Sequence, residues 1–264
     1  MNIKDITNMA IMFGILLVPI GFASNSTGMI VFGFVLLIGA FLVIKMNDRW
    51  VRDGYSQIVN EKFENFKDDV YIDELYRASG LVNSDFEFRN VFYAFKGEMF
   101  ENYPLIMTTL DITLERMVVN KTLDMIAFAH LNIPKNIQGT IRICGGKRDV
   151  VLTGDMAEIK STNLAFNERY RVYLNDLKLE KEILNDTFTN EFMKLHNKYR
   201  VYSEGLDIII NNNDVYIQLD CAAMADYLYI NSDLYKLAMK RFKLKIMFIL
   251  DFVKIIKENI ERNL

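Results

Sequence analysis

Side chains suited to catalysis or metal binding are few in this sequence. The only histidines are His130 and His196, and the only cysteines are Cys144 and Cys221. Neither histidine has a second histidine or a cysteine three or four positions away, as a metal site on one element would require. We therefore predict no metal and no cofactor. Both cysteines are interpreted as buried, inert thiols, with Cys144 as a nucleophile the less favoured alternative.

A glycine pair followed by basic residues occurs in the stretch CGGKRD, residues 144–149. A phosphate-binding loop would require glycine in place of Ile141 and serine or threonine in place of Arg148, so the stretch predicts a hairpin turn instead. Four clustered acids flank a predicted helix start, where carboxylates complement the helix dipole: Asp68, Asp69, Asp73 and Glu74. The catalytic residues, if any exist, are unknown from the sequence.

The N-terminal 50 residues carry two apolar runs, which predict membrane spans over about 6–23 and 29–45. Neither run shows the polar face of a helix in water, and each approaches the ~20 residues that cross a bilayer. Gly14, Gly21, Gly33 and Gly39 fit membrane helices, where small residues permit close contact. The alternative is a cleaved signal peptide, since Gly21-Phe22-Ala23 has the small-x-small pattern of a cleavage site.

The charges that flank the two runs predict an orientation. Lys45, Arg49 and Arg52 follow the second run, whereas the connecting turn from Ser24 to Gly28 carries no charge. The positive-inside rule then places both termini in the cytoplasm of a bacterial cell, with the turn outside. Trp50 follows the second run at the depth where an aromatic ring favours the interface, and its alternative role is a packed anchor of the following domain.

Residues 51–264 predict one soluble domain, since charges of both signs become frequent and no linker divides this stretch. The class is α+β, with antiparallel hairpins. A net charge of −3 argues against non-specific nucleic-acid binding. We expect helices over 51–66, 71–80, 177–199 and 231–260, strands over 106–114 and 123–132, and hairpins over 139–153 and 206–220 that turn at Gly145-Gly146 and at Asn211 to Asp214.

The C-terminal helix has an apolar stripe with a second apolar face, so we expect it to be buried in the domain or against another subunit. The stripe comprises Phe242, Ile246, Ile249, Val253, Ile256 and Ile260. It should not cross the membrane, because Asp251 and Lys254 would each cost ~2.5 to 3.5 kcal/mol in mid-span. Three lysines lie on another side of the helix: Lys236, Lys240 and Lys243. A solvated basic face is the favoured interpretation, and contact with anionic lipid is the alternative.

Several stretches resemble a bacterial family with a two-span hairpin and a domain of unknown function, DUF3137. They include Ser79-Gly80-Leu81, an aromatic strand motif at Phe166, Tyr170, Val172 and Tyr173, and a helix motif at Phe192, Met193 and Leu195. Around Phe95 to Pro104 the sequence departs from the family, because an acidic-then-glycine turn is missing. The resemblance implies an α+β cytoplasmic domain on a membrane hairpin, and it supplies no catalytic residues.

The sequence thus favours a membrane-anchored cytoplasmic binding or scaffolding module over an enzyme. Its expected partners are the lipid bilayer, through both spans, and a membrane or cytoplasmic protein, while oligomerisation is left open. The alternative is a membrane-associated hydrolase, for which a pocket that gathers His130 or His196 with carboxylates would be the decisive observation. A pore is disfavoured, because neither span carries an ionisable residue.

Overall fold

The computed structural model of the 264-residue chain describes residues 3–56, 63–66, 68–81, 86–114, 122–146, 150, 152, 154–179, 183–200, 205–220 and 232–262. Its contacts divide the chain into two compact units. The first comprises residues 1–58 and 223–241, and the second comprises residues 59–222 and 242–264. That residues 51–264 fold by themselves, as the sequence predicts, stays a prediction.

Two antiparallel helices dominate the first unit, α1 (Ile3–Ala23) and α2 (Thr27–Ser56). The turn between them is short because Asn25 takes a left-handed conformation with φ of 50° and the Ser26 amide donates to the Gly21 carbonyl at 2.9 Å. Thr27 and Gly28, which were predicted in the turn, already belong to α2.

Small residues seven positions apart face each other between α1 and α2. Thr7, Gly14 and Gly21 are buried on α1, and Gly33 and Ala40 are buried on α2. A Cβ atom on Gly33 would lie 2.8 Å from Val18 Cγ2, and one on Gly14 would lie 2.9 Å from the Gly33 carbonyl oxygen. The helices therefore approach too closely for a larger side chain, as in glycine-mediated packing of membrane helices.

The second unit is built on a seven-stranded antiparallel sheet, which confirms the α+β class with an antiparallel sheet. The sheet order is β1-β2-β3-β4-β6-β5, and β7 also pairs with β4. The strands are β1 (Phe63–Asn65), β2 (Phe86–Phe100), β3 (Tyr103–Leu114), β4 (Thr122–Gly145), β5 (Ala157–Ile159), β6 (Tyr170–Leu174) and β7 (Leu206–Asp220). Strand β4 is central, as predicted for residues 123–132.

Two predicted hairpins are wrong. Residues 206–220 form one continuous strand, because β7 pairs along its length with β4, which is equally uninterrupted. Both strands bend at the same irregularity in their pairing. Between the pairs Asn132–Asp214 and Thr140–Asn211, β4 advances by eight residues and β7 by only three. The second error concerns Gly145-Gly146. There β4 ends, the Gly146 amide donates to the Arg169 carbonyl, and the described residues 150 and 152 lie outside strands.

A hairpin does join β2 to β3, where the family turn is missing. Asn102 provides the left-handed conformation of that turn, with φ of 64°. In the strand predicted over 106–114, Met107 and Thr108 point to opposite faces of the sheet, yet each is only 1% exposed. The middle of β3 is therefore buried on both faces, although Pro104 near its start is exposed, and an alternating pattern is informative only where one face meets water.

The predicted helix over 51–66 is also wrong at its end. Its described start belongs to α2, whereas Phe63 to Asn65 form β1 and pair with Phe95 to Gly97 of β2. The predicted helix over 177–199 begins only at Asp186, where α6 (Asp186–Tyr199) is capped by the side chain of Asn185. Residues Ile58 and Val59 lie outside the described residues.

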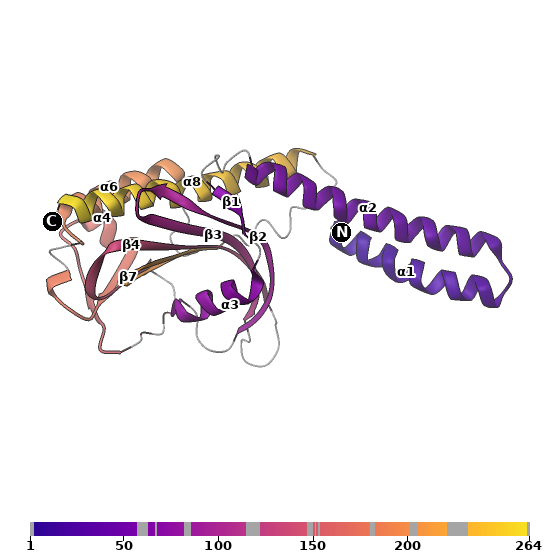
Figure 1. The fold of residues 1–264 in the computed structure, drawn as a ribbon, viewed down its shortest axis with the longest axis horizontal. Helices are drawn as coiled ribbons and strands as arrows, with labels where there is room; N and C mark the ends of the chain where they lie inside the picture. Colours follow the sequence, from indigo (N-terminus) through magenta and orange to yellow (C-terminus); the bar gives the residue numbers. More distant parts are fainter. Residues whose placement is uncertain are drawn as a thin grey trace. The chain divides into compact units, whose positions relative to one another are not determined.

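One face of the sheet is covered by α6 and by the part of α8 (Ser232–Arg262) that belongs to this unit (Figure 1). Phe192 of α6 is fully buried, and its ring packs edge-on against Phe248 and Phe252 of α8. Asp251 of α8 accepts hydrogen bonds from Lys198 at 2.8 Å and from the Tyr199 hydroxyl at 2.5 Å. The predicted burial of the C-terminal helix on two faces is confirmed for its described residues.

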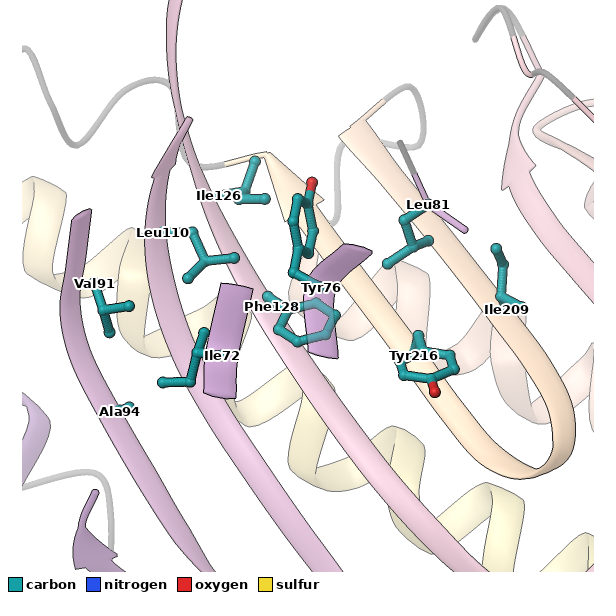
Figure 2. Packing of buried hydrophobic residues seen from close by; sticks show 10 residues of the cluster. All are labelled: Ile72, Tyr76, Leu81, Val91, Ala94, Leu110, Ile126, Phe128, Ile209 and Tyr216. Atoms are coloured by element: carbon teal, nitrogen blue, oxygen red, sulfur yellow. The ribbon is translucent and has the colours of Figure 1, made fainter. Parts of the chain in front are cut away.

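The opposite face carries α3 (Asp69–Ala78), which is predicted correctly (Figure 1). Asp68 caps its start by accepting from the Tyr71 amide, and Gly80 ends it with φ of +69°. Figure 2 shows Ile72 and Tyr76 of α3 among apolar side chains of the strands. The strand members of this cluster are Val91, Ala94, Leu110, Ile126, Phe128, Ile209 and Tyr216.

Candidate binding surface on the sheet

A row of polar side chains crosses the face of the sheet that carries α3. Residues directly opposite each other in antiparallel strands point to the same face. Glu64 of β1 pairs with Lys96, Lys96 with Ile106, Ile106 with His130, and His130 with Tyr216. Tyr216 belongs to the cluster under α3, so the whole row lies on that face. The row spans five strands that are far apart in sequence.

A second row lies next to the first, two residues further along each strand. Glu98 pairs with Pro104 on the β2–β3 hairpin, and Asn132 pairs with Asp214 on β4 and β7. Glu98 and Pro104 are exposed, and the Asp214 side chain is 35% exposed. We call the two rows together the polar strip. It consists of Glu64, Lys96, Glu98, Pro104, Ile106, Asn132, His130, Asp214 and Tyr216.

The β1 end of the polar strip is accessible because α3 is short, whereas Tyr216 at the other end is buried. The 10 residues of α3 extend only about 15 Å. At the N-terminal end of α3, the Tyr71 ring meets Phe66 edge-on at 5.7 Å, and Lys96 Nζ lies 5.0 Å from the centre of the Phe66 ring. Lys96 belongs both to this contact and to the strip, and 48% of its side chain is exposed.

His130 is held by a carboxylate within the strip. Its Nε2 lies 2.7 Å from Asp214 Oδ1, which also accepts from Asn132 Nδ2 at 3.1 Å. The imidazole stacks on Tyr216 at 5.0 Å. Burial, with help from Asp214 and Tyr71, raises the pKa of Tyr216 to about 12, so this phenol stays protonated. The arrangement resembles a carboxylate-oriented general base, although no Ser or Cys nucleophile is bonded to His130 among the described residues.

An open groove of about 470 Å³ lies at the β1 end of the strip. Its lining comprises Phe63, Glu64, Lys96, Gly97, Glu98, Pro104, Leu105 and Ile106. Lys96 Nζ lies 3.2 Å from Glu64 Oε1. The groove therefore combines apolar walls with two carboxylates and one ammonium. It does not include His130, which is one strand beyond Ile106.

A buried ion pair supports the same face. Arg142 on β4 binds Asp207 on β7 through two hydrogen bonds, Nε to Oδ1 at 3.0 Å and Nη2 to Oδ2 at 2.6 Å. Arg142 also donates to the carbonyls of Gly80 and Leu81, just beyond the end of α3. The pair thus fastens α3 to the sheet. No sequence pattern identifies it, because the partners are 65 positions apart.

His196 lies away from the strip and has structural partners. Its Nδ1 is 2.6 Å from the Tyr170 hydroxyl, and its Nε2 is 2.5 Å from Arg169 Nη1. Arg169 can only donate, so Nε2 is the acceptor and Nδ1 carries the proton in the neutral ring. Burial, and then the Arg169 charge, lower the pKa of His196, which favours that neutral form.

The other predicted residues are dispersed. Cys144 is fully buried, which agrees with an inert thiol, and Cys221 lies outside the described residues. Lys45 is exposed on α2, with Nζ 5.8 Å from the centre of the Phe41 ring. Arg49, Trp50 and Arg52 lie on α2, and Lys236 lies on α8, but their side chains lie outside the described part of the structure.

Lys240 and Lys243 are exposed on α8. No group of three or more potential metal ligands occurs among the residues that the structure describes. Sequence reasoning singled out His130 but missed Lys96, Glu98 and the pairing of His130 with Asp214. These residues become neighbours only through the register of β1, β2, β3, β4 and β7.

Comparison with protein families finds a match for the part of the chain that runs from within β4 to within α8. Residues 127–257 match the model of a family described as a protein of unknown function (DUF3137). The predicted resemblance is confirmed for these residues, which do not include α1 and α2. Among solved structures, the crystal structure of the mycobacterial trehalose monomycolate transport factor A, TtfA, is similar with a TM-score of 0.42 and 7% sequence identity, covering 81% of this chain and 96% of that chain. No curated protein matches the chain.

The DUF3137 motif residues form the core rather than the strip. Tyr170 and Phe192 pack ring to ring at 5.1 Å, and Phe166 packs against Phe192 at 5.5 Å. All three side chains are buried. The motifs that carry the resemblance therefore report the framework of the fold, as the sequence implied.

Proposed function

We propose that this protein is a membrane-anchored binding module, held by the α1–α2 hairpin and binding its partner at the polar strip. The packing of the hairpin supports the proposal of a membrane anchor, because its small residues lie inside and its large apolar residues lie outside. Glycines fill the contact between the helices, whereas 17 large apolar side chains point outward, among 22 exposed ones in the described residues. Met12 is 64% exposed and Phe22 is 63% exposed.

A hairpin of this kind is unfavourable in water. Burial of one such side chain contributes ~1.5 to 3 kcal/mol, so leaving a continuous belt of them exposed forgoes many times that amount. In a bilayer the same belt contacts acyl chains, while the small residues allow close helix packing. By length and composition, α1 can cross a membrane over Ile6–Ala23, and the apolar part of α2, Thr27–Val43, is slightly shorter.

The proposed orientation places both termini in the cytoplasm and the Ser24–Ser26 turn outside. Its support is the cluster of Lys45, Arg49 and Arg52 after the second apolar segment, with Trp50 at the interface. A variant with both native cysteines replaced receives one cysteine, at Ser26 or near Asn263. An impermeant maleimide applied to intact cells should label the first variant only. Labelling of the second would refute the orientation, and loss of the first ~23 residues would establish signal cleavage.

The proposal also includes the three lysines of α8, which would strengthen membrane attachment by contacting anionic lipid. Lys236 and Lys240 belong to the compact unit that contains the hairpin, and Lys243 follows one turn later. An exposed lysine close to an anionic membrane contributes ~1 kcal/mol of attraction. The fragment that begins at Arg52 and therefore lacks the hairpin should bind anionic liposomes, and with all three lysines changed to glutamine it should be released at lower salt than the wild-type fragment. Identical release, or no binding by either fragment, would show a solvated basic face only.

The binding role rests on one observation, the open groove at the exposed β1 end of the polar strip. Binding sites are concave, with apolar walls and a few polar groups that fix orientation. We would place a photo-crosslinking amino acid at Pro104, which lines the groove, and for comparison at Leu177, which is 68% exposed and outside the groove. A discrete adduct from native membranes at Pro104 alone is expected. Equal adducts at both positions, or none, would refute the site.

The hydrolase alternative keeps one specific observation in its favour, the 2.7 Å contact between His130 and Asp214. With Asp214 on Nε2, the Nδ1 atom is the one available to take a proton from water, as in general-base catalysis. A His130→Gln variant distinguishes the two functions. If the strip only binds, the partner captured at Pro104 has the same mass in wild type and variant. If it hydrolyses, the intact partner accumulates only in the variant.

A further inference from the structure

We propose that the groove at the β1 end of the polar strip binds a cationic segment of a protein partner, one in which arginine or lysine alternates with apolar residues. This inference names the ligand class of the proposed binding site and rests on that function. The groove lies on β1, β2 and β3, within a single compact unit. Three features of its lining support the chemistry.

The charges in the groove favour a cation. Glu64 and Glu98 face one Lys96, so the formal charge of the lining is −1. The ammonium of Lys96 is already engaged, at 3.2 Å from Glu64 Oε1 and 5.0 Å from the centre of the Phe66 ring. Glu98 is exposed and has no ion-pair partner among the described residues. An incoming anion would meet no unshared positive charge, whereas an incoming cation would meet Glu98.

Lys96 shows how this surface holds a cation. A carboxylate on one side and an aromatic face on the other form the combination that stabilises ammonium and guanidinium groups. A second ring, Tyr71, stands edge-on to Phe66 at 5.7 Å and is 41% exposed. The groove itself is lined by one aromatic residue, Phe63, together with Glu64 and Glu98, so a further cation there would meet an aromatic ring and a carboxylate.

The apolar part of the lining fits the rest of such a segment. Glu98 and Lys96 of β2 lie opposite Pro104 and Ile106 of β3, so a segment that crosses the two strands meets charged and apolar side chains in turn. The methylene stem of an arginine or lysine can cover such surface while its head reaches a carboxylate.

A charge series in the groove tests the proposal on the full-length protein in nanodiscs of zwitterionic lipid. The probe is a short, dye-labelled peptide of alternating valine and arginine, with a valine–glutamate peptide as its counterpart. Lys96→Gln makes the groove charge −2, and Glu64→Gln with Glu98→Gln makes it +1. The matched control, Glu168→Gln with Glu191→Gln, removes two exposed acids outside the groove.

We expect fluorescence anisotropy to give an affinity for the arginine peptide that rises in Lys96→Gln and falls about tenfold in the groove double variant, with the control unchanged. Equal affinities across the series, or preference for the glutamate peptide, would overturn the cationic ligand. If the Pro104 adduct forms while the series stays flat, the binding site stands and only its ligand class is wrong. If neither occurs, both proposals fail.

Discussion

The buried Arg142–Asp207 pair gives the most exacting test of the fold that supports the polar strip. The Asp207 side chain is 0% exposed and that of Arg142 is 5% exposed, so neither charge is solvated. Asp207→Asn preserves volume but removes the negative charge, which leaves a buried guanidinium without its counter-ion. Breaking one partner of such a pair costs about 3 to 5 kcal/mol. This is a large fraction of the stability of a typical domain.

Hydrogen exchange with mass spectrometry on the full-length protein in nanodiscs measures this cost as a lower free energy of opening for β4 and β7. The control removes both charges, as Arg142→Met with Asp207→Leu. It should cost only about 1 to 3 kcal/mol, because the carbonyls of Gly80 and Leu81 lose a donor but no charge stays buried. A loss below 1 kcal/mol in Asp207→Asn would refute the reasoning. So would a double variant whose loss of stability equals the sum of the losses in Arg142→Met alone and Asp207→Leu alone.

Three further predictions concern the core, the hairpin and the response to pH. Phe192→Ala should lower the free energy of unfolding by about 3 to 5 kcal/mol, because the ring is fully buried among Phe166, Phe188 and Phe252; a wild-type melting temperature would contradict this. Gly33→Ala should lower the unfolding temperature in detergent, since its Cβ would lie 2.8 Å from Val18 Cγ2, whereas Gly39→Ala meets nothing within 4 Å and should be neutral or stabilising; the reverse order would disprove the helix contact. His196 has a lowered pKa in the folded protein, so the unfolded chain binds more protons below about pH 6.5, and stability should fall as the pH decreases from there towards the folded pKa. The slope of stability against pH should be smaller in His196→Gln, and an unchanged slope would assign it to other groups.

The strand and helix errors share a physical origin. Asn211 to Asp214 has the composition of a turn, yet β7 runs through it because β4 offers backbone partners on both sides of a shared bend. Phe63 and Phe66 have helical spacing, yet the edge of β2 recruits that stretch into the sheet. Local sequence reports the preference of a segment, whereas hydrogen bonds from distant strands decide between alternatives of similar energy.

The candidate site likewise depends on contacts between strands that are distant in sequence. His130 was visible as a rare residue, but nothing nearby in sequence indicated Asp214, which is 84 positions away. Glu64, Lys96 and Ile106 are ordinary residues for exposed strands. Their alignment depends on the register of β1, β2 and β3, and a shift by one residue would move each side chain to the other face.

The sequence by itself determined the features that depend on local composition and period: two uncharged apolar segments, the short helix that ends at Gly80, the buried stripes of α6 and α8, and the family resemblance. These features depend on hydrophobicity and spacing within about 20 residues, which the chain carries wherever it folds. Only the tertiary structure decided the path of β4 and β7, the Arg142–Asp207 pair and the polar strip with its groove. Each of these requires strands distant in sequence to adopt one register, and that choice reflects the packing energy of the whole sheet.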